Sequence, residues 1–225
     1  PIGGEFGNIT YPVNSPLAVT MGFAVSEAAV GNYADAMDSL EGAVAPPGAD
    51  YLLSWVKAVV FAAAQRWTDV IEQVRDAEKW PDPFLASAGQ VAHGVAAANL
   101  GLFNEAERRL TEANSSPAGS ACAPAIAWNL AMTRRALGND EGATALLEWL
   151  QATHPEPRVA EALKNPSYRL TTTTADLIGA RTDAWDPNSV VADTSERDAL
   201  LAAAESELER QIGLGSVKEQ VARYR

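Results

Sequence analysis

Apolar residues recur every three or four positions along most of this chain, a spacing typical of amphipathic helices. The apolar segments come in pairs, and proline or glycine separates one pair from the next, as expected where helices stop. The predicted pairs are Leu17–Val30 with Tyr33–Glu41, Asp50–Ala64 with Trp67–Glu78, Pro83–Leu100 with Phe103–Ala113, and Cys122–Leu137 with Glu141–Thr153. A shorter helix, Arg158–Lys164, is predicted after the last pair.

A turn phrase recurs inside the pairs at steps of 34, 36 and 37 residues, beginning at Gly31, Gln65, Gly101 and Gly138. Glycine at this place permits the left-handed backbone that ends many helices. An aromatic residue (Tyr33, Trp67, Phe103) and then a small one (Ala36, Ala106, Ala143) follow in three copies each, and they favour close helix packing. A helix-pair repeat of this length predicts a mainly α fold, a tetratricopeptide-type α-solenoid over residues 17–165.

Both ends of the chain break this period. Glycines followed by the alternating Ile9, Tyr11 and Val13 favour a strand, so residues 1–16 are expected to be the remnant of a small β-hairpin or β-finger element. Residues 166–194 are expected to form a β-prone segment and an extended linker. Residues 195–225 are expected to contain a linker helix, Glu196–Ile212, and the start of a truncated further module.

Composition excludes several classes of protein. A hydrophobic content of 47% is ample for a core, whereas a formal charge of -12 repels phosphate backbones and argues against nucleic-acid binding. No apolar run approaches the roughly 20 residues of a bilayer span, so direct membrane insertion is not expected. The single cysteine, Cys122, excludes an internal disulfide and suits a reducing compartment. Without a secretory signal, the expected location is the cytoplasm.

Patterns that carry catalysis or hold cofactors are missing. His93 and His154 are 61 residues apart, with no cysteine or acidic ligand at metal-site spacing. Neither a phosphate-binding loop nor a nucleophile elbow occurs. We therefore predict no catalytic, cofactor-binding or metal-binding residues, and no enzyme, in this chain.

The expected functional feature is a surface for a protein partner. In tetratricopeptide arrays the first helix of each pair lines a concave groove, which can receive an amphipathic helix from a partner. Alignment by the turn phrases places nine candidate residues there: Met21, Val25, Trp55, Val59, Val91, Val95, Trp128, Met132 and Arg135. For Trp55 and Trp128, packing in the core between adjacent helices is an equal alternative, because a one-residue shift of helix phase would place them there.

Several phrases resemble one known family. NITYPVNSPLAVTMGFA, NYADAMDSLE, ARTDAWDP and the terminal ELERQIGLGSVKEQVARYR closely resemble EccA, the AAA+ ATPase component of mycobacterial type VII (ESX) secretion systems. The resemblance covers essentially the whole chain. Ile212 to Val221 also resembles the entry to the ATPase module of the wider CbxX/CfqX group. The chain is thus expected to be most of an N-terminal domain, with further residues upstream.

The resemblance implies ATP and magnesium only for the missing ATPase module, and none in this chain. It implies partners among secreted ESX substrate proteins or other secretion components, and a hexameric ring formed through that module, while this chain alone is expected to be a monomer. No established binding residues come with the resemblance.

Two alternatives to substrate recognition remain open. The array could be a scaffold that orders the ring or docks it on the membrane apparatus, its groove filled internally by the segment at 168–174 or by the tail. It could also be a lid that lowers ATP turnover until a partner displaces it.

Overall fold

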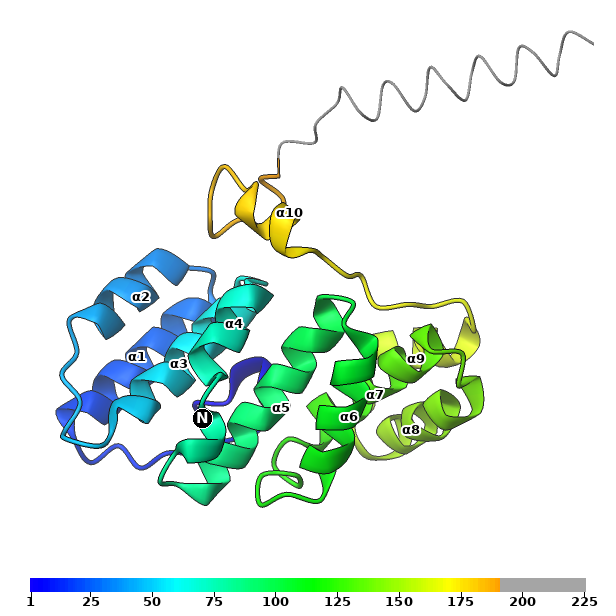
Figure 1. The fold of residues 1–225 in the computed structure, drawn as a ribbon, viewed down its shortest axis with the longest axis horizontal. Coiled ribbons are helices and arrows are strands. Elements are labelled where there is room, and N and C mark those ends of the chain that lie inside the picture. Colours follow the sequence, from blue (N-terminus) through cyan, green and yellow to red (C-terminus); the bar gives the residue numbers. More distant parts are fainter. Residues whose placement is uncertain (191–225) are drawn as a thin grey trace, which may run out of the picture. The chain divides into compact units, whose positions relative to one another are not determined.

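A computed structural model of the chain describes residues 1–190, and these contain ten α-helices and two short 3-10 helices (Figure 1). The α-helices are α1 (Pro16–Ala29), α2 (Tyr33–Glu41), α3 (Asp50–Ala63), α4 (Trp67–Val74), α5 (Pro83–Asn99), α6 (Phe103–Asn114), α7 (Ala123–Ala136), α8 (Asp140–Thr153), α9 (Pro157–Lys164) and α10 (Ala175–Gly179). The 3-10 helices are η1 (Gly4–Phe6) and η2 (Ala77–Lys79).

Four antiparallel helix pairs, α1/α2, α3/α4, α5/α6 and α7/α8, stack side by side, and α9 covers the last one (Figure 1). This arrangement confirms the predicted mainly α, tetratricopeptide-like solenoid. The first helices of the pairs, α3, α5 and α7, are the most deeply buried, with Val56, Val91 and Ala131 fully shielded from solvent. Residues Pro1–Ser189 belong to one unit. The domain boundaries inferred from the sequence remain a prediction.

Side-chain caps mark the starts of α1 and α5. The side chain of Ser15 accepts a hydrogen bond from the main-chain N–H of Ala18 at the start of α1, and Asp82 accepts two at the start of α5. In both helices proline occupies the first turn, where its missing N–H has no partner to lose. Local sequence therefore fixes these two boundaries.

The turn phrase joins the two helices of each pair. Gly31, Gly101 and Gly138 have φ angles of 89°, 76° and 83°, the left-handed conformation predicted for them. Gln65 stands at the same place in the second pair and is also left-handed, with φ 53°. The second pair therefore keeps the geometry of the turn without the glycine that suits it.

The N-terminal segment, residues 1–9, contains no strand, and the prediction of a β-hairpin or β-finger remnant over residues 1–16 is wrong. The segment forms η1 within a tight loop, which the main-chain N–H of Ile2 closes by donating to the carbonyl of Ile9 at 2.6 Å. Ile2, Phe6 and Ile9 are buried against α3, α5 and α7, and Figure 1 draws this dark blue segment amid the helices. Its stabilising partners are thus distant helices and not a neighbouring strand.

The close approach of this segment to the helices requires glycine. A Cβ at Gly7 would collide with the main chain of Ala121, and one at Gly4 with the side chain of Val59. The glycines that suggested a hairpin turn therefore allow the segment to lie directly on α3 and on the residues before α7.

The return segment, residues 166–189, runs back from α9 past the C-terminal ends of α7, α5 and α3 (Figure 1). The β-prone run at 168–174 forms no strand, so that expectation is wrong. The main-chain N–H of Thr173 instead donates to the carbonyl of Asn99, 2.9 Å away. This bond supplies a partner for one of the carbonyls that a helix end leaves unpaired. The predicted linker helix Glu196–Ile212 and the start of the further module lie outside the described residues.

Candidate functional site

The nine residues predicted to line a partner groove are mostly in the core. Eight are buried: Met21, Trp55, Val59, Val91, Val95, Trp128, Met132 and Arg135. Val25 is partly buried and packs against the same core. The N-terminal segment packs on α3, α5 and α7, on the face that we call the concave side, so most of these positions face protein atoms and not an open groove. The expected apolar groove is therefore corrected to a covered surface.

Trp55 shows how the covering works. Its side chain is 0% exposed, its indole Nε1 donates to the main-chain carbonyl of Ile2 at 2.9 Å, and its ring lies 5.6 Å from that of Phe6. The core alternative thus describes this tryptophan.

Arg135 has a structural role. Its guanidinium, 4% exposed, donates to the carbonyl of Ala162 at 2.8 Å and to those of Asn165 and Tyr168 at 3.3 and 3.4 Å. Burial lowers its pKa, and the nearby charge of Arg169 lowers it further. Arg135 therefore ties α7 to the end of α9 and to the return segment.

A pocket of about 300 Å³ remains on the concave side. Its walls come from the C-terminal end of α3, from α5, α7 and α9, from residues 168–171 of the return segment, and from Glu5 of the N-terminal segment. Two of the predicted residues, Val95 and Trp128, do lie at this pocket. We call it the concave pocket.

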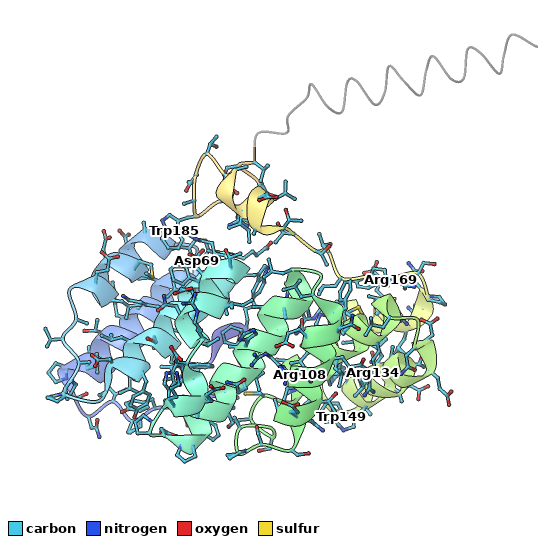
Figure 2. The ribbon with its side chains drawn as sticks, in the orientation of Figure 1. Asp69, Arg108, Arg134, Trp149, Arg169 and Trp185 are labelled. Carbon is cyan, nitrogen blue, oxygen red and sulfur yellow. The ribbon has the colours of Figure 1, made fainter. Side chains whose placement is uncertain are left out.

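Polar groups dominate the concave pocket. Asn99 and Asn129 line it, and the Nδ2 of Asn99 is 3.5 Å from the Oδ1 of Asn129. Arg158 places its guanidinium 4.6 Å from the centre of the Trp128 ring, and Arg169, labelled in Figure 2, comes from the return segment. This lining suits a polar ligand better than the apolar helix expected from the sequence.

These polar residues were not predictable as a site because they are scattered along the sequence. Asn99 and Asn129 are 30 positions apart, and the arginines lie on two other elements. The available signal was the presence of a carboxamide inside the otherwise apolar runs VAAANL and AIAWNLAM.

A second cluster joins the return segment to the second helix pair. The indole of Trp185 stacks on Phe61, with ring centroids 5.9 Å apart and planes 11° apart, and the guanidinium of Arg66 lies 4.9 Å from its centre. Arg181 donates to the carbonyls of Ala64 and Gln65 at 2.9 and 3.0 Å. Figure 2 shows Trp185 beside the helices of this pair, near Asp69. No local pattern in the sequence predicts these contacts.

The described part of the chain shows no sign of metal or thiol chemistry. Residues 1–190 contain no group of three or more His, Cys, Asp or Glu side chains that could hold a metal ion. Cys122 is buried, and burial raises the pKa of its thiol to about 11. No helix within this range is long and apolar enough to cross a bilayer.

Comparison with known proteins identifies the family. Residues 1–191 match the family described as "T7SS, ESX-1 secretion system protein EccA1, N-terminal domain". The chain belongs to the EccA1 N-terminal domain family. The EccA resemblance read from the sequence is thereby confirmed.

Two relatives and one solved structure support the assignment. The ESX-1 secretion system protein EccA1 is 67% identical over 225 residues in Mycobacterium leprae (strain TN) and 68% identical over 224 residues in Mycobacterium tuberculosis (strain ATCC 25618 / H37Rv). A crystal structure of the N-terminal domain of the EccA1 ATPase from Mycobacterium tuberculosis matches with a TM-score of 0.82 and 70% identity, over 84% of this chain and 69% of that one.

All of this chain aligns with the two relatives, yet it spans only 39% of their length. Residues 1–191 are the part of the chain that matches the N-terminal domain family. This family assignment agrees with the prediction that the chain is not an enzyme.

Proposed function

We propose that this EccA1 N-terminal domain is a protein-interaction module of a cytoplasmic type VII secretion ATPase, and that it recognises secreted ESX proteins or other secretion components. One observation carries the proposal: the concave pocket is open to solvent and is lined by polar side chains from three successive helix pairs. Repeat arrays commonly use this face to bind protein segments.

The proposed recognition site differs from the apolar groove predicted from the sequence. Trp55 is covered by the N-terminal segment, so its substitution would report on folding and not on binding. Arg169 is exposed and lines the concave pocket, which makes it the better probe.

A specific observation favours a second candidate function, that of a scaffold. Part of the concave side is covered by a segment of the same chain, residues 1–9, and a scaffold needs no open groove for cargo. The ring-forming contacts and the nucleotide site would then lie in the rest of the longer protein, together with its ATP and magnesium.

Deletion of residues 1–190 from the full-length protein tests these functions. We expect loss of binding to ESX substrates, measured by fluorescence anisotropy, with unchanged basal ATP hydrolysis and unchanged ring size on size-exclusion chromatography. Loss of the ring would favour the scaffold. A rise in basal hydrolysis would favour the regulatory lid. Substrate binding that survives the deletion would overturn recognition by this domain.

A further inference from the structure

The concave pocket gathers positive charge in an acidic protein. Arg158 and Arg169 both line it, and Glu5 is the one carboxylate among its described lining residues. The chain as a whole carries a formal charge of -12. A positively charged pocket in a negatively charged protein indicates a site for an anionic group, because the walls of a concavity strengthen the electric field of fixed charges.

The two guanidinium groups differ in how far they are engaged. Arg158 pairs with the exposed carboxylate of Glu156 at 2.7 Å and lies over the ring of Trp128. Arg169 donates only to the main-chain carbonyls of Pro166 and Tyr168, and within residues 1–190 no carboxylate pairs with it. Its remaining N–H groups can therefore serve a ligand. A guanidinium binds a carboxylate well because its planar donors can form two parallel hydrogen bonds.

The side-chain amides that line the pocket suit a peptide main chain. Asn99 Nδ2 donates to the carbonyl of Val95, and Asn129 Nδ2 donates to that of Ala125, each at 2.9 Å. No donor among the described residues contacts the Oδ1 of Asn99. Carboxamides offer both donors and acceptors, which matches the N–H and C=O groups of an extended peptide.

The wall made by the return segment has unpaired main-chain groups. Within the described range, the N–H and C=O groups of residues 169–171 have no hydrogen-bond partner, although Thr173 nearby is bonded to α5. An extended edge of this kind can pair with a second extended chain, a common mode of peptide recognition.

We infer that the concave pocket binds an acidic, extended peptide segment of a partner protein, whose carboxylate lies between Arg158 and Arg169. Its main chain runs along residues 169–171 and above Asn99 and Asn129. This inference rests on the proposed recognition function and adds the chemistry of the ligand. The carboxylate belongs either to an Asp or Glu side chain or to a chain terminus.

Four pools of fluorescein-labelled eight-residue peptides test the inference on the whole chain. Two acidic pools carry Asp or Glu at one fixed position, and two neutral pools carry Asn or Gln there. In each case one pool has a free C-terminus and the other has an amidated C-terminus. The neutral amidated pool has no carboxylate and is the reference. If the ligand is a side-chain carboxylate, we expect the acidic amidated pool to bind at least tenfold more tightly than this reference. If the ligand is a terminal carboxylate, we expect the same of the neutral pool with free C-termini. Whichever of these two pools binds identifies the source of the carboxylate. Equal binding by all four pools would overturn the inference.

Matched variants locate the site. Arg158→Gln and Arg169→Gln should each weaken binding of the preferred pool by about threefold to tenfold, with unchanged thermal unfolding midpoints. Arg108→Gln is the control, since Arg108 is an exposed arginine of α6 paired with Glu105 and Glu112 and does not line the pocket. An equal loss with Arg108→Gln would show a general effect of charge and would overturn the site.

The full-length protein separates this inference from the proposed function. If ESX substrates bind through the domain but are indifferent to Arg158→Gln and Arg169→Gln, recognition stands and the carboxylate site is wrong. If the acidic pool binds but deletion of residues 1–190 leaves substrate binding intact, the carboxylate site stands and the proposed function is wrong.

Discussion

The indole Nε1 of Trp55 donates a hydrogen bond to the main-chain carbonyl of Ile2, 53 positions earlier and 2.9 Å away. Both residues are buried, so the bond fixes the N-terminal segment on the concave side of α3. It turns a residue predicted to receive a partner into one that holds the protein's own chain.

Loss of this bond should destabilise the domain. Trp55→Phe keeps an aromatic ring but leaves the buried carbonyl of Ile2 without a donor, which costs about 1 to 3 kcal/mol. Urea unfolding followed by circular dichroism measures the change. Trp149→Phe is the control, because Trp149 is 41% exposed and should change stability much less. Equal effects of the two variants would show that the bond to Ile2 contributes nothing.

The left-handed residue of the second turn should respond to glycine. Gln65 has φ 53°, which costs a side-chain-bearing residue about 1 to 2 kcal/mol, partly offset by the greater backbone entropy that glycine loses. We expect Gln65→Gly to raise the free energy of unfolding by about 0.5 to 1 kcal/mol.

The converse change, from glycine to alanine, belongs in a turn whose glycine has open space around it. A Cβ at Gly138 would meet no atom within 4 Å, so Gly138→Ala isolates the backbone cost and should lower stability by about 1 kcal/mol. Chemical denaturation of both variants tests the pair. A loss of stability in Gln65→Gly would mean that its side-chain packing outweighs the backbone strain.

Stability should fall in acid because of His93. Burial, aided by the charge of Arg109, lowers the pKa of His93 from 6.5 to about 4. Between these values the unfolded chain binds more protons than the folded one, so the free energy of unfolding decreases as pH drops from about 6.5 to about 4. His93→Gln should remove this part of the acid dependence, as measured by denaturation at several pH values. His154→Gln, at an exposed site, should leave it in place.

Cys122 should resist alkylation in the folded protein. Burial raises the pKa of its thiol to about 11, so little thiolate exists at pH 8. The raised pKa alone should lower the rate of alkylation by iodoacetamide by on the order of 100-fold relative to the urea-unfolded chain, because the thiolate is the nucleophile. Mass spectrometry over time measures both rates. Rapid labelling of the native protein would contradict the buried position.

The helix pairs were predictable because each carries its signal locally. The expected helix Tyr33–Glu41 is α2, and the glycines of three turns have the predicted φ angles. The covering of the concave side by residues 1–9 was not predictable. A helix face that packs against this segment is as apolar as one that packs against another helix, so the sequence does not distinguish the two. The concave pocket depends on Arg158 and Arg169 meeting Asn99 and Asn129, and no local pattern records contacts between such distant positions.

The return segment changes how this array should lose its structure. A repeat array with contacts only between neighbours can fray from its ends, one helix pair at a time. Here Arg181 bonds carbonyls 117 and 116 positions earlier, and Thr173 bonds Asn99, so the chain after the last pair is fastened to the second and third. The last helices cannot peel away without also releasing those bonds. The middle of the array and its C-terminal end should therefore melt together in a single cooperative transition.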